Sequence, residues 1–166
     1  MATMAKEFVT YEEVNAFLEA AFSGQTTEVS TVLNRKWYMV DVMSENNETA
    51  LMLATWNGNT ETVEMLCQHN ASTFTTNEDD ENVFDQVCRL DKKMMKRMEG
   101  ILQKARNEEI DSWNVGENIT NKVIYEKDEE NQGVWCIYRT DNTGLYFEGQ
   151  GDDELTRSGF EMMTCA

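Results

Sequence analysis

Few residues of this sequence are placed where they could carry out catalysis. The single histidine, His69, stands at the end of a predicted helix, and it is better explained as a helix-terminal residue than as a catalytic base. The four cysteines are widely separated in the chain: Cys67, Cys88, Cys136 and Cys165. Without a close pair they predict neither a zinc site nor a disulfide framework. Phosphate-binding, dinucleotide-binding and metalloprotease motifs are also missing, so we expect no enzymatic activity, no cofactor and no metal.

One acidic segment has to be tested against calcium binding. The stretch 128–133 places Gly133 at the sixth position of a possible twelve-residue loop. The twelfth position is Arg139, whereas an EF-hand requires a bidentate Glu there. The loop therefore lacks its most important ligand. We interpret it, like the acidic run 78–81, as a solvated polar segment.

Composition and charge restrict the class of partner. The chain has 166 residues, which suffices for one compact domain or for a core of roughly 100 residues with an appendage. Lys and Arg total 14 against 31 Asp and Glu, and the formal net charge is −17. Such a chain is repelled by nucleic acids and anionic membranes, and a basic protein segment is its natural counterpart. The sequence shows no membrane-spanning run and no apolar core of a secretory signal, so we expect a cytoplasmic protein.

The elements that position these residues repeat along the chain. The clearest unit runs over residues 49–71 and contains two short helical patterns separated by Gly58. Its key apolar and small positions are Leu51, Ala54, Gly58, Val63 and Leu66. The earlier residues Phe17, Ala20, Gly24, Val29 and Val32 match them at a constant offset of 34. A looser third copy begins at residues 82–84 and continues as a helical pattern through Ala105, without the central glycine.

This repeated unit resembles the ankyrin repeat, a unit of about 33 residues whose first helix reads T-P-L-H-x-A-A-x-x-G and whose second ends in L-L-x-x-G-A. The middle copy departs from the pattern at Ala50, Met52 and Asn70, and Asn can replace glycine where a left-handed backbone is needed. Residues 44–47 and 77–80 resemble the family's D-x-x-G turn. The resemblance covers residues 9–106 and implies a mainly α solenoid of about three repeats, preceded by a tail at 1–8. Thr10 and Glu13 have the spacing of a capping box that begins the first helix.

The remainder of the chain, residues 107–166, has a different character. It carries 14 acidic and 4 basic residues. Short β-branched and aromatic runs at 122–125, 134–138 and 145–147 are separated by segments rich in turn formers. We expect an acidic extension that contains a small β-hairpin or meander, whose apolar face must pack on the repeats or on a partner.

The ankyrin resemblance also implies where a partner binds. The family uses exposed residues in the turns and at the end of each first helix. Those positions are Phe22, Ser23, Glu45, Asn46, Glu48, Trp56, Asn57, Glu78, Asp79, Glu81, Arg89 and Leu90. Phe22 and Trp56 would form an aromatic anchor on the concave face, and carboxylates would surround it and select a basic segment. Alternatively, the C-terminal strands fold back over both aromatics and make them core residues.

Two functions remain open at this point. In the first, the protein is an adaptor or scaffold that recruits a basic protein partner through the concave face. In the second, it is a structural subunit of a larger assembly, docked through residues 107–166. Trp37 and Tyr38 stand where the family has Gly-Ala, and we favour packing beneath the first repeat over a contact site of their own. Met94, Met95 and Met98 are best explained as core residues.

Overall fold

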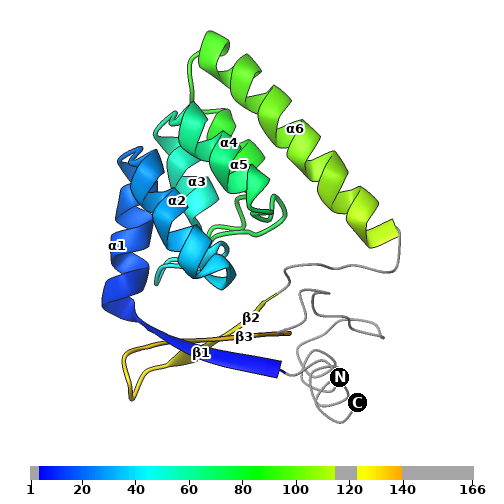
Figure 1. Ribbon diagram of the computed structural model, residues 1–166. Helices are drawn as coiled ribbons and strands as arrows, with labels where there is room; N and C mark the ends of the chain where they lie inside the picture. The colour runs from blue at the N-terminus through cyan, green and yellow to red at the C-terminus, as the bar shows by residue number, and fades with distance from the viewer. Residues whose placement is uncertain (1–3, 115–122, 140–166) are drawn as a thin grey trace.

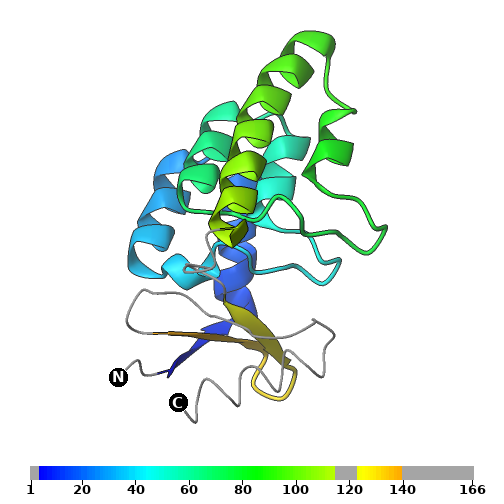
Figure 2. The same ribbon diagram turned by 90° about the vertical axis from the view of Figure 1, so that its right-hand side faces the viewer.

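The structure is a computed structural model that describes residues 4–114 and 123–139. Helices stacked in pairs make up most of it, and a small sheet lies below them in Figure 1 and Figure 2. The helices are α1 (Tyr11–Phe22), α2 (Thr26–Arg35), the short 3-10 helix η1 (Trp37–Met39), α3 (Ala50–Trp56), α4 (Thr60–Gln68), α5 (Val83–Val87) and α6 (Lys92–Asn114). The strands are β1 (Met4–Thr10), β2 (Ile124–Asp128) and β3 (Gly133–Arg139).

Polar side chains fix where the first helix of each pair begins. The Thr10 hydroxyl accepts a hydrogen bond from the Glu13 backbone N–H, and the Glu13 carboxylate accepts one from the Thr10 N–H, both at 3.1 Å. This confirms the predicted capping box. The Thr49 hydroxyl accepts from the Met52 N–H at the start of α3, and Asn82 begins α5 with a second capping box.

Two glycines separate the helices of the first two pairs. Gly24 and Gly58 have φ angles of +75° and +70°, a conformation that side chains with a Cβ rarely adopt. At Gly24 an added Cβ would lie 2.9 Å from the side-chain oxygen of Asn59. The two positions are therefore equivalent in structure, as the 34-residue offset predicts.

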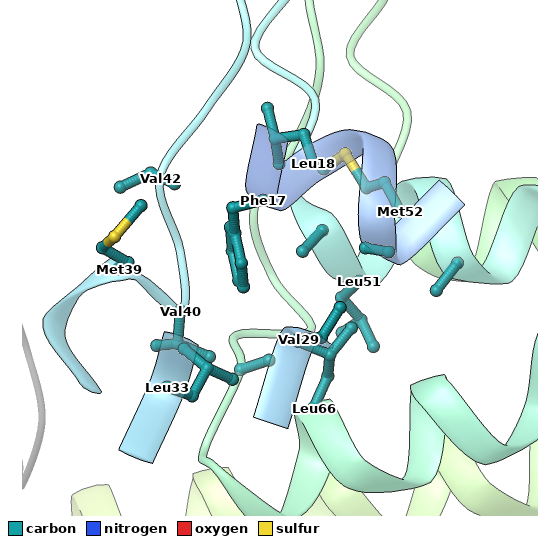
Figure 3. Packing of buried hydrophobic residues seen from close by; sticks show 14 of the residues in the cluster. Phe17, Leu18, Val29, Leu33, Met39, Val40, Val42, Leu51, Met52 and Leu66 are labelled. Carbon is teal, nitrogen blue, oxygen red and sulfur yellow. The ribbon is translucent and has the colours of Figure 1, made fainter. Parts of the chain in front are cut away.

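The core runs through the stack along both rows of helices. α1, α3 and α5 pack side by side, and α2, α4 and α6 form the second row. Figure 3 shows Phe17 of α1 near Leu33 of α2, Leu51 of α3 and Val40 from the segment after η1. All four side chains are buried. The repeat therefore buries one apolar face of each helix against its neighbours.

The third pair differs from the first two in length. α5 has five residues, whereas α6 has 23 and passes beyond residue 106, the expected end of the stack. Met98 and Leu102 are fully buried against the stack, and Met94 and Met95 pack on the same core, as predicted. No helix among the residues that the structure describes is both long and apolar enough to cross a bilayer.

The sheet joins segments from both ends of the described chain. Its order is β1-β3-β2 with antiparallel pairing throughout, and Thr10 lies opposite Gly133. The predicted hairpin is present as β2 and β3. Residues 4–8 were predicted to be part of a tail but belong to strand β1, because they pair with β3. The predicted run 145–147 lies outside the described residues.

Aromatic side chains attach the sheet to the first helix pair. The Tyr138 ring of β3 stacks on Tyr38 with ring centroids 4.9 Å apart, and it meets the edge of Trp37 at 4.7 Å. The Tyr125 hydroxyl of β2 donates a hydrogen bond of 2.7 Å to the Tyr38 carbonyl. Trp37 and Tyr38 thus pack, as we favoured, and their neighbour is the sheet.

Candidate functional site

Two polar turns project from the stack beside the ends of α1 and α3. In the first turn, the Ser44 hydroxyl accepts hydrogen bonds from the backbone N–H groups of Asn46 and Glu48, each at 3.2 Å. Asn47 has a φ of +60°, a left-handed conformation that Asn tolerates better than most residues. The side-chain acceptor and the left-handed residue together hold this turn in shape.

The second turn repeats this geometry 33 residues later. The Asn77 side-chain oxygen accepts from the N–H groups of Asp79 and Glu81 at 2.9 and 3.0 Å. Asp80 has a φ of +59°. The Glu78 N–H donates to the carbonyl of Asn46 at 3.1 Å, which ties the two turns together. Their carboxylates therefore form one acidic rim.

Phe22 and Trp56 end α1 and α3 and expose 40% and 49% of their surface. The amide groups of Asn57 and Asn59 donate hydrogen bonds of 2.8 and 2.7 Å to the Phe22 carbonyl. These bonds satisfy a helix-end carbonyl and fix the end of α1 against that of α3. The two exposed aromatic residues are thus held on neighbouring helix ends of the stack.

Arg89, which follows α5, completes this surface. Its guanidinium carbon lies 4.7 Å from the centre of the Trp56 ring, within the range of a cation–π contact. One terminal nitrogen donates to the Glu81 carboxylate and the other to the Gln86 side-chain oxygen, both at 2.7 Å. Aromatic, acidic and basic groups therefore meet at a single place.

These side chains line a groove with a volume of about 300 Å³. Its lining residues are Phe22, Asn46, Glu48, Leu53, Trp56, Asn77, Glu78, Asp79, Glu81, Gln86 and Arg89, and we call it the aromatic groove. It contains no nucleophile paired with a base. No cluster of three metal-ligating side chains occurs within residues 4–114 or 123–139. The arrangement is suited to binding a polar or cationic group against an aromatic surface.

A family model of ankyrin repeats in three copies matches residues 4–78. These residues are ankyrin repeats. The match extends from β1 to the second turn and covers somewhat less than half of the chain. A search of curated proteins found no match. Ankyrin repeats are generally protein–protein interaction modules and are typically not enzymes.

Most residues that the ankyrin resemblance selected lie together. Those that line the aromatic groove are Phe22, Asn46, Glu48, Trp56, Glu78, Asp79, Glu81 and Arg89. Four selected residues do not line it. Ser23 is exposed beside the groove, Asn57 bonds to the Phe22 carbonyl, and Leu90 packs on the core. Glu45 instead lines a small hollow with Tyr11 beside the β-hairpin.

Three lining residues were not predicted as binding residues, namely Leu53, Asn77 and Gln86. Leu53 and Gln86 each precede a selected residue by three positions, a spacing that places helical side chains on one face. This spacing could have identified them. Gln86 is buried and orients Arg89, so its role depends on a contact that the sequence does not display.

The described strands do not cover the exposed aromatic pair. The sheet contacts α1 and η1, and it lies at the opposite end of α1 from Phe22 (Figure 1). The alternative expectation, in which the C-terminal strands fold over Phe22 and Trp56, does not hold for β2 and β3. The rest of the C-terminal extension, residues 140–166, lies outside the described residues.

The junction between the stack and the sheet contains a carboxylate in an unusual environment. Asp41 accepts a hydrogen bond of 2.9 Å from the Ser72 N–H, and its own N–H donates to the Tyr125 hydroxyl at 3.2 Å. Burial raises the pKa of Asp41 to about 7. The hydrogen bond from Ser72 opposes this increase in the pKa, whereas the nearby Glu109 carboxylate adds to it.

The segment tested for calcium forms the turn of the β-hairpin. The Asp128 carboxylate accepts hydrogen bonds from the backbone and side chain of Asn131 and from the Trp135 indole. These bonds stabilise the charged form and lower the pKa of Asp128. The carboxylate therefore serves to hold the turn.

Proposed function

We propose that the protein is a non-enzymatic adaptor whose aromatic groove, on the concave face of the ankyrin stack, docks a basic segment of a protein partner. The observation that carries this proposal is the meeting of two exposed aromatic residues with an acidic rim in one groove. Large apolar side chains are normally buried, so a pair left exposed together is unusual for a surface without a partner.

Aromatic and acidic groups contribute to binding in different ways. Phe22 and Trp56 offer large, rigid surfaces that lose little conformational entropy when a partner covers them. The carboxylates of Glu48, Glu78 and Asp79 attract and orient cationic side chains, and exposed charges of this kind mainly affect association rate and selectivity. Binding should therefore weaken as salt concentration rises.

The alternative function, a structural subunit docked through residues 107–166, receives less support. The strand β3 already has β1 on one side and β2 on the other. One face of the sheet packs on η1 through Tyr125 and Tyr138, and β1 and β3 also contact α1. The hairpin thus has neighbours within the chain, and it needs no partner to cover that face.

The proposal includes a cytoplasmic location. Cys67, Cys88 and Cys136 are free thiols. Cysteines that remain unpaired are typical of reducing compartments such as the cytosol, where disulfides rarely persist. A highly acidic surface would also keep the protein away from anionic membranes and nucleic acids.

A pull-down from native cell extract tests the proposal. The intact protein is compared with a Phe22→Ala/Trp56→Ala double variant, and circular dichroism checks that both retain their helix content. The double variant should lose a specific partner that carries a basic segment, because it lacks the aromatic surface that anchors that segment.

Phe74→Ala provides the matched control. Phe74 is 39% exposed, similar to Phe22, but it lies outside the aromatic groove and packs under Arg106. This variant should retain the partner. If the folded double variant captures the same partners as the intact protein, the aromatic groove is not the docking site.

A further inference from the structure

Within the lining of the aromatic groove, Arg89 carries the positive charge, and it occupies the place where a cation is best bound. Its guanidinium lies over the Trp56 ring at 4.7 Å and pairs with Glu81 at 2.7 Å. A ring face and a carboxylate are the two groups that a guanidinium from another molecule would also seek. The chain therefore already fills this position with a side chain of its own.

We propose that Arg89 is a built-in competitor, and that the partner docks by inserting an arginine side chain in its place on Trp56 and Glu81. This inference rests on the proposed function, and it specifies both the partner's side chain and a means of limiting affinity. The partner's arginine repeats the contacts that Arg89 makes within the chain.

The geometry favours arginine over lysine. Glu81 and Gln86 each accept from a different terminal nitrogen of the same guanidinium, while the planar group lies over the indole ring. An ammonium is a compact charge without a planar face, and it lacks this fork of donors. A site shaped around two acceptors and a ring therefore discriminates between the two basic side chains.

Arg89 is also held loosely enough to be displaced. Its side chain is 44% exposed and that of Glu81 is 26% exposed, so water screens their attraction. Neither residue belongs to the buried core. The acidic residues Glu48, Glu78 and Asp79 line the same groove and can accompany an incoming cation. Displacing Arg89 requires movement of one surface side chain and leaves the helices in place.

Binding of a labelled hexa-arginine peptide to the full chain tests the inference, with hexa-lysine as the comparison peptide. Arg89→Ala should bind hexa-arginine roughly fivefold more tightly than the unaltered chain, because the competing guanidinium is gone. Arg89→Lys keeps the charge but loses the fork, so it should also bind more tightly. When Arg89 is kept, the single variant Trp56→Ala should reduce the binding of hexa-arginine more than the binding of hexa-lysine.

Lys93→Ala is the matched control for charge. Lys93 is exposed near the start of α6 and does not line the aromatic groove. Its removal changes the net charge as Arg89→Ala does, and it should alter affinity by less than about twofold. The competitor role is overturned if Arg89→Ala resembles Lys93→Ala, or if either Arg89 variant binds more weakly than the unaltered chain.

The outcomes separate this inference from the proposed function. Binding that depends on Trp56 but does not increase in the Arg89 variants retains the docking groove and rejects the competitor. Binding that is equal in all variants, Trp56→Ala included, rejects both. Binding that appears only after Arg89 is replaced, and still requires Trp56, supports both.

Discussion

The protein contains two groups of aromatic residues with opposite environments. Phe22 and Trp56, at the aromatic groove, are 40% and 49% exposed, whereas Tyr38, at the junction with the sheet, is 7% exposed. Phe22 and Trp56 end α1 and α3, and Tyr38 lies in η1, shortly after the end of α2. The difference arises because Tyr138 of β3 stacks on Tyr38, while β2 and β3 stay away from the groove.

This comparison shows that residue type does not decide the role of an aromatic side chain in a repeat stack. At the junction, ring stacking and a hydrogen bond from Tyr125 make the aromatic residues part of the core. At the groove, both rings stay partly exposed and line the same groove as several carboxylates. We therefore expect junction variants to lose stability and groove variants to lose binding.

The largest effect should come from Tyr38→Ala. It removes a buried ring and leaves a cavity beside Tyr138, so the free energy of unfolding should decrease by about 3 kcal/mol. Trp56→Ala, at an exposed helix end, should cost less than about 0.5 kcal/mol. Urea denaturation of both variants measures the difference. Equal losses would mean that Trp56 belongs to the core, and the comparison would fail.

Asp41→Asn should change the pH dependence of stability. Since the folded state raises the pKa of Asp41 from 3.8 to about 7, that state binds the proton more tightly than the unfolded chain does. This contribution is full below about pH 4 and is lost as pH rises through about 7, so the unaltered chain should become less stable over this range. The variant should lack this decline and be more stable than the unaltered chain at pH 8.

Denaturation profiles at pH 4, 6 and 8 measure this effect. Glu126→Gln, which removes an exposed carboxylate from β2, serves as the control and should follow the unaltered chain. A decline of the same size in Asp41→Asn and in the unaltered chain would show that another group causes it.

A smaller effect is expected from Tyr125→Phe. The variant keeps the ring but removes the hydroxyl that donates to the Tyr38 carbonyl and accepts from the Asp41 N–H. Loss of these bonds should lower the free energy of unfolding by about 1 kcal/mol. Tyr138→Phe preserves the stacked ring and should change stability less. The opposite ranking would locate the main attachment of the sheet at Tyr138.

Much of the stack was predictable from local pattern. The 34-residue offset aligned Gly24 with Gly58, and both have the positive φ that a turn between helices requires. The family's binding positions brought Phe22, Trp56 and the acidic turns into one groove. These features depend on neighbours within one or two repeats, and such neighbours leave a periodic signal in the sequence.

The features that escaped prediction depend on distant contacts. Strand β1 is ordered by β3, whose residues come more than a hundred positions later, and no short-range pattern near residue 4 records that pairing. The long α6 continues through Gly100 and past residue 106, whereas its counterparts α2 and α4 end at Arg35 and Gln68. The packing partner of Tyr38 was hidden for the same reason, because Tyr138 belongs to the sheet.

The pairing of β1 with β3 also has a consequence for folding. Stacks of repeats usually fray from their ends, since each terminal repeat has only one neighbour. Here β1 continues directly into α1, so unravelling of the first repeat must also separate the sheet. Contacts between residues so far apart in sequence form late and slow the folding of the whole chain. In hydrogen exchange, amides of α1 should then open together with those of β3, as one cooperative unit.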